Sequence, residues 1–140
     1  MRAKDVIVIL DCGSQYTQLI ARRIRELKVY SEILPWDASL EEIRSKNPKG
    51  IIISGSPKSI LSPGSPLIPE ELLDLGVPVL GICYGMQLLS HLLGGQVGKV
   101  GLAEYGRACI NIQGEGRGLF KGLPKQFNVW MSHGDTVINL

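Results

Sequence analysis

Four short apolar runs alternate with helical patterns through the first two thirds of the chain, and this alternation constrains the fold more than any other feature. The runs cover Val6–Leu10, Tyr30–Leu34, Gly50–Ser54 and Val77–Gly81. The first and third are continuous in aliphatic residues, as is typical of parallel strands covered on both faces. A strand and a helix repeated four times predict a doubly wound α/β domain with a mostly parallel, flavodoxin-like sheet.

Helical patterns fill the segments between these runs. An amphipathic helix is expected from Gln15 to Leu27, and a capping box at Ser39 opens a short second helix that ends at Asn47-Pro48. Pro69 can open a third helix, which Gly76 closes. The spacing of apolar residues in the first helix predicts one buried face, with arginines opposite; that face comprises Tyr16, Leu19, Ile20, Ile24 and Leu27.

The C-terminal third has a different pattern. Strands are predicted over Arg107–Gln113 and Phe127–Met131, joined through a glycine-rich loop at 114–118. Because no long helix is expected between them, we interpret these strands as antiparallel additions to the α/β domain. No repeat or linker marks a second domain, so residues 1–140 are expected to form a single one.

Composition excludes several classes of function. With 44% hydrophobic and 20% charged residues the chain is typical of a soluble globular domain, and a net charge of +2 gives no support to a nucleic-acid or membrane partner. Three cysteines, an odd number at wide spacing, do not form a disulfide framework. A reducing compartment, and hence a cytoplasmic location, is the expectation.

The segment from Gly81 to Gly85, Gly-Ile-Cys-Tyr-Gly, joins the fourth strand to an apolar-faced helix expected from Tyr84 to Leu93. Glycines on both sides of Cys83 suit a sharp strand-to-helix turn in which backbone passes close to backbone, as in a nucleophile elbow. The free amides and the dipole of the helix N-terminus would favour the thiolate. The alternative is an ordinary buried cysteine at a βα turn.

Three turns are expected to face one crevice, because the C-terminal ends of parallel strands share an edge of the sheet. They lie at 11–15, 55–58 and 83–85. A thiolate nucleophile needs donors for an oxyanion, and the amides of Ser56 and Tyr84 are candidates. An anion site at Gly13-Ser14 is disfavoured, since no Walker or Gly-x-Gly-x-x-Gly pattern accompanies it.

A general base is also needed, and the chain contains two histidines. His91 follows Cys83 on the same helix at a rise of about 12 Å, which is too far for contact. We therefore expect it to be a surface or packing residue. His133 is expected in a loop after a strand, where it could line the crevice, so on the residues alone it remains a candidate base.

Four sequence blocks together resemble the class I (triad-type) glutamine amidotransferase domain. They follow one another in the family's order over nearly the whole chain, and the first and last are most similar to members whose ammonia serves the conversion of XMP to GMP. The blocks are Asp11–Tyr16, Ile53–Pro57, Gly81–Gln87 and Met131–Asp135.

The resemblance implies a reaction and a role for each matching residue. In that family a cysteine attacks the carboxamide of glutamine, giving ammonia and a glutamyl thioester that water then hydrolyses. Cys83 would be the nucleophile, with the amides of Ser56 and Tyr84 as the oxyanion hole. Gln87 would help to hold the substrate, and His133 would be a substrate-loop residue instead of the base. The loop that grips the amino-acid end of glutamine would comprise Ser132, His133, Gly134 and Asp135.

Two departures from the family pattern bear on this interpretation. The family's Gly-Gly-Pro loop reads Gly55-Ser56-Pro57 here, and a serine would be strained if the position required a positive φ. The family's catalytic His and Glu lie in a His-Pro-Glu sequence that these 140 residues lack. We therefore expect a domain that is incomplete at its C-terminus and inactive or weakly active alone.

The resemblance also implies partners. The ammonia would be used by an ATP-pyrophosphatase synthetase domain or subunit that binds ATP and Mg²⁺, while this domain would need no cofactor and no metal. One alternative is an amidotransferase for another acceptor, as in anthranilate or carbamoyl phosphate synthesis, which the Asp-x-Gly-Ser-Gln-Tyr block disfavours. Others are a flavodoxin-like module that binds phosphate or flavin and carries an incidental cysteine, and a structural fragment without a formed site.

Overall fold

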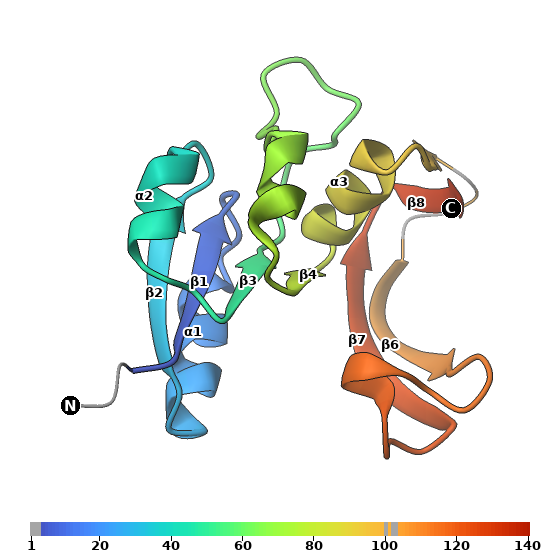
Figure 1. Ribbon diagram of the computed structural model, residues 1–140. Coiled ribbons are helices and arrows are strands. Elements are labelled where there is room, and N and C mark those ends of the chain that lie inside the picture. Colours follow the sequence, from blue (N-terminus) through green and yellow to red (C-terminus); the bar gives the residue numbers. More distant parts are fainter. Residues whose placement is uncertain (1–3, 100, 102–103) are drawn as a thin grey trace.

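A four-stranded parallel sheet forms the centre of the molecule (Figure 1). The computed structural model describes residues 4–99, 101 and 104–140. The strands are β1 (Val6–Asp11), β2 (Tyr30–Pro35), β3 (Gly50–Ile53) and β4 (Val79–Gly81), in the spatial order β2-β1-β3-β4. All three pairings are parallel. The predicted doubly wound architecture is confirmed.

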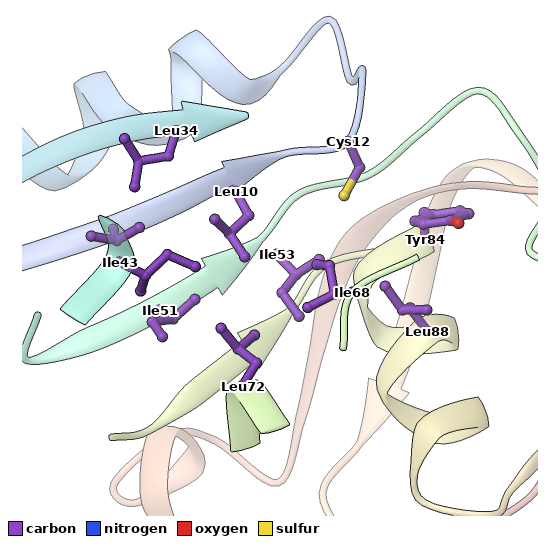
Figure 2. Packing of buried hydrophobic residues seen from close by; sticks show 11 residues of the cluster. Leu10, Cys12, Leu34, Ile43, Ile51, Ile53, Ile68, Leu72, Tyr84 and Leu88 are labelled. Carbon is purple, nitrogen blue, oxygen red and sulfur yellow. The ribbon is translucent and has the colours of Figure 1, made fainter. Parts of the chain in front are cut away.

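Helices cover both faces of this sheet. Helix α1 (Thr17–Glu26) packs on one face, while α2 (Leu40–Ser45), the 3-10 helix η1 (Glu70–Leu75) and α3 (Tyr84–Leu92) pack on the other (Figure 1). The main core lies between the sheet and these last three elements, and Figure 2 shows its side chains converging there. Its buried members include Leu10, Ile43, Ile51, Ile53, Leu72 and Leu88.

The face that α1 buries differs from the predicted one. Thr17 and Ala21 are buried, whereas Tyr16, Leu19 and Leu27 are exposed. The carbonyl of Ala21 accepts a hydrogen bond from the buried hydroxyl of Ser31 on β2, at 3.0 Å. Ile20 and Ile24 of the predicted face are half-buried beside Thr17 and Ala21. The buried face therefore overlaps the predicted one and is rotated towards the small side chains, which allow this close approach of helix and strand.

The C-terminal third adds two antiparallel pairs. Strands β6 (Glu104–Asn111) and β7 (Gln126–His133) form the predicted ribbon, with the 3-10 helix η2 (Gly118–Phe120) in their connection. Strands β5 (Gln96–Gly98) and β8 (Thr136–Asn139) form a second pair, which the sequence pattern does not predict because both segments are very short. The ribbon lies beside α3, on the side of the molecule away from β2 (Figure 1).

Among the helices of the described residues, none combines the length and the apolar character needed to cross a membrane.

Candidate active site

The elbow at Cys83 has the geometry of a strained turn between β4 and α3. Cys83 has φ +53° and ψ −109°, and it precedes the first residue of the helix. Its carbonyl accepts the amide of Gln87 at 3.1 Å, and the amide of Ile82 donates to the carbonyl of Ile53 at 3.0 Å. A positive φ is unfavourable for a residue with a Cβ, and such strain occurs mainly at functional sites.

The two glycines of the elbow allow the helix to begin directly against the strands. A Cβ at Gly85 would lie 2.2 Å from the carbonyl oxygen of Ile53, and one at Gly81 would lie 2.5 Å from the backbone of Gly85. Neither contact is possible for a real side chain. The prediction that backbone passes close to backbone here is confirmed.

One cavity of about 690 Å³ lies at the C-terminal edge of the sheet. The three predicted turns line it, together with the end of β7 and the turn that follows. Every residue assigned to the site from the sequence lines this cavity: Ser56, Cys83, Tyr84, Gln87, Ser132, His133, Gly134 and Asp135. Sequence reasoning missed four further lining residues, because the motifs do not include them: Ile20, Ser59, Lys99 and Tyr105.

The candidate oxyanion donors are held without the strain that the sequence suggested. Ser56 is not among the residues with a positive φ, so a serine at this position carries no left-handed strain. Its hydroxyl accepts the amide of Lys58 at 3.2 Å. The Tyr84 side chain is buried and its hydroxyl donates to the carbonyl of Pro66, while burial raises the pKa of this phenol to about 12. The Tyr84 ring therefore fixes the loop after β3 against α3.

Several polar groups of the turn after β1 are hydrogen-bonded to one another. The amide of Gly13 donates to Oδ1 of Asp11 at 2.9 Å, and the amide of Tyr16 donates to Oγ of Ser14 at 3.0 Å. Oδ1 of Asp11 also accepts the hydroxyl of Thr17 at 3.0 Å. Two amides of the turn are therefore bonded to its own side chains, which leaves fewer donors for a phosphate.

The three cysteines are all free, but their environments differ. Burial raises the pKa of the Cys83 thiol, whereas the helix N-terminus led us to expect a stabilised thiolate. The Cys12 thiol is buried, and desolvation raises its pKa to about 12, with a further contribution from the charge of Asp11. Cys109 is exposed on β6. Burial therefore acts against the thiolate at Cys83, opposite to the effect expected of the helix N-terminus.

This shift predicts the pH dependence of alkylation in the 140-residue chain. Burial disfavours the charged thiolate, so the Cys83 pKa lies above 9.0, its ordinary value. The rate of Cys83 alkylation by iodoacetamide should rise about tenfold per pH unit and still be rising at pH 9. Site-resolved peptide mass spectrometry measures it, with exposed Cys109 as the internal comparison. A rate that levels off near pH 7 would contradict the prediction.

The end of β7 and the turn after it contain the predicted substrate residues. Ser132 and His133 lie in the strand itself, not in a loop as expected, and Gly134-Asp135 forms the turn to β8. Nδ1 of His133 lies 2.8 Å from the carbonyl oxygen of Asp135, and Nε2 of Gln87 donates to the same oxygen at 2.9 Å. His91 is exposed in the last turn of α3, as predicted for a surface residue.

The sheet, the elbow and the cavity that it faces define an α/β domain with a cysteine at a strand-to-helix turn that lines a cavity. The family model for class-I glutamine amidotransferases matches residues 8–140, and the chain belongs to this family. GMP synthases (glutamine-hydrolysing) are similar to it over nearly its whole length. That of Syntrophomonas wolfei is 54% identical over 98% of the chain, and that of Campylobacter lari is 55% identical over 100%. The chain spans 27% of the length of each.

Solved structures agree with the fold. A protein from Thermoplasma acidophilum, described as a candidate subunit of GMP synthase, is 30% identical, with a TM-score of 0.83 over 100% of this chain and 70% of that protein. A glutamine amidotransferase from Thermotoga maritima superposes with a TM-score of 0.67 at 22% identity over 97% of this chain and 63% of that protein. The first supports the family membership, and the second supports the fold alone.

Proposed function

We propose that the chain is the glutaminase part of a GMP synthase, which hydrolyses glutamine and supplies ammonia for the ATP-dependent conversion of XMP to GMP. One observation carries the proposal: Cys83 lies at a strained elbow and lines the same cavity as Ser56, Tyr84 and the turn at Gly134-Asp135. Identity of 54% and 55% to two GMP synthases supports the choice of acceptor over anthranilate or carbamoyl phosphate.

The reaction would proceed in two balanced steps. Sγ of Cys83 attacks the carboxamide carbon of glutamine, and the amides of Ser56 and Tyr84 donate to the oxygen that becomes negatively charged. The C–N bond then breaks, the nitrogen takes a proton and leaves as ammonia, and a glutamyl thioester remains. Water adds to the thioester carbon, the C–S bond breaks, and glutamate is released with the thiol regenerated.

The first step also needs a base that accepts the thiol proton of Cys83. Since burial raises its pKa, a base must take the thiol proton before or during attack. The family resemblance assigns the role to the histidine of a His-Pro-Glu sequence, which the 140 residues do not contain.

The proposal includes the setting of the reaction. We assign the use of ammonia to an ATP-pyrophosphatase synthetase domain or subunit, with ATP and Mg²⁺ bound there and no cofactor or metal in this domain. We also infer a cytoplasmic location, consistent with three free thiols. A module that binds phosphate or flavin is disfavoured, because the model of the class-I glutamine amidotransferase family matches residues 8–140.

Selective labelling of Cys83 tests the proposal. A diazoketone analogue of glutamine should modify Cys83 ahead of Cys109, because the cavity concentrates and orients the reagent at the half-buried thiol. Iodoacetamide at pH 7 should show the reverse order, since Cys109 is exposed and Cys83 is not. Cys12 should resist both reagents. Peptide mass spectrometry at short reaction times measures the order, and excess glutamine should slow the labelling of Cys83 by the diazoketone alone.

The control is a matching diazoketone that lacks the amino-acid end. The proposed substrate-binding residues would have no group to bind in this reagent. It should lose the preference for Cys83. If both diazoketones follow the order of iodoacetamide, the cavity does not recognise glutamine, and a binding module with an incidental cysteine becomes the better interpretation.

A further inference from the structure

Asp135 connects three parts of the site that come from different segments of the chain. Its side chain is 6% exposed, in the turn between β7 and β8. Its carboxylate contacts the loop after β3, its carbonyl contacts α3, and the same carbonyl contacts the end of β7. The loop, the helix and the strand are therefore linked through one buried residue of the cavity lining.

The carboxylate of Asp135 accepts a hydrogen bond from the hydroxyl of Ser59. Ser59 lies three residues after Ser56, in the same loop. Its hydroxyl oxygen also accepts the amide of Leu61 at 3.1 Å, and its carbonyl accepts the hydroxyl of Ser65. The loop is therefore folded around Ser59, so the bond to Asp135 fixes the position of the loop as a unit.

The carbonyl of Asp135 links the turn to α3, the helix that follows Cys83. Nε2 of Gln87 donates to it at 2.9 Å, and Gln87 is buried one helical turn after Cys83. Nδ1 of His133 lies 2.8 Å from the same oxygen. A displacement of Asp135 would thus change the distance between the loop that carries Ser56 and the helix that begins at Cys83.

We propose that Asp135 and Ser59 are a pair of positioning residues, which hold the loop carrying the Ser56 amide in register with Cys83. This inference rests on the proposed glutaminase function. It changes the role expected of Asp135, because the carboxylate acts through Ser59 instead of contacting glutamine. Oxyanion stabilisation depends on donor positions within a few tenths of an ångström, so loss of the pair should slow the chemical step.

Glutaminase kinetics of the intact gene product test the proposal. S59A and D135A should each lower kcat about tenfold, because a loosened loop stabilises the oxyanion less, with KM for glutamine changed less than about twofold. The double variant should be no worse than S59A alone, since each change removes the same hydrogen bond between the Ser59 hydroxyl and the Asp135 carboxylate. S59T retains the hydroxyl and should recover most of the activity. S62A changes an exposed serine of the same loop and serves as the matched control.

The results distinguish a positioning role of Asp135 from direct binding of glutamine. A large rise in KM for D135A with normal S59A kinetics would show that Asp135 binds glutamine directly and would overturn the proposal. Independent, multiplicative losses in the double variant, or unchanged kcat in both single variants, would also overturn it. A wild-type protein that releases no glutamate would overturn the proposed function itself, and this inference with it. Urea unfolding of each variant confirms that the compared proteins are folded.

Discussion

The G85A variant should lose the native fold. Its Cβ would lie 2.2 Å from the carbonyl oxygen of Ile53 and 2.9 Å from the carbonyl carbon of Ile53, and both are backbone atoms of a central strand. Neither can move without breaking the pairing of β3, because Ile53 also accepts the amide of Ile82. We expect a loss of about 3 kcal/mol or more in the free energy of unfolding, a large share of the stability of a domain of this size.

Urea unfolding followed by circular dichroism measures this effect. G134A is the matched control, because within the described part of the chain no heavy atom beyond its chain neighbours lies within 4 Å of a Cβ at Gly134, and this glycine has no positive φ. The free energy of unfolding of G134A should stay within about 0.5 kcal/mol of the wild-type value, the range of ordinary surface substitutions. A G85A protein that unfolds at the wild-type urea concentration would mean that α3 does not begin against β3 as the structure shows.

The C83A variant should lose glutaminase activity by about 10⁴-fold or more, because the reaction as proposed has no other route to the thioester. Its fold should be kept, since Cys83 is half-buried and makes no contribution to the buried core cluster. C109A, at an exposed cysteine of β6, is the control and should keep full activity. Steady-state glutamate release by the intact gene product measures both.

The same position should show a conflict between stability and function. Cys83 has φ +53°, a conformation that costs a residue with a Cβ about 1–3 kcal/mol. C83G removes that cost, so it should be at least as stable towards urea as C83A although it is equally inactive. A C83G protein clearly less stable than C83A would show that the elbow is not strained. Residual glutaminase activity near the wild-type level in C83A would remove Cys83 from the mechanism.

The sequence was most informative where a local pattern has one structural solution. The apolar runs at Val6–Leu10 and Gly50–Ser54 correspond to β1 and β3, because a strand buried on both faces has few alternatives. The capping box at Ser39 appears as the hydrogen bond from the amide of Glu42 to its hydroxyl, at 3.0 Å. The glycines around Cys83 predicted a close backbone approach, which the structure contains.

Sequence reasoning was less reliable where the outcome depends on packing. The buried face of α1 centres on Thr17 and Ala21, because a close contact with β2 prefers small side chains over the apolar ones that the pattern selected. The pKa of Cys83 is raised by desolvation, which depends on how deeply the tertiary structure buries the thiol. Ser59 was missed as a site residue, since nothing in its immediate sequence indicates a partner that lies 76 residues away.

The sequence by itself determined the parallel α/β scheme, the elbow and the position of Cys83 in it, because strand periodicity and glycine placement act over a few residues. The tertiary structure alone decided how the loop at Ser59, the helix at Gln87 and the turn at Asp135 meet. These contacts join segments far apart in the chain, and their geometry depends on how the whole sheet edge is packed. The local rules that predict a strand or a turn contain no information on contacts between segments so far apart in the chain.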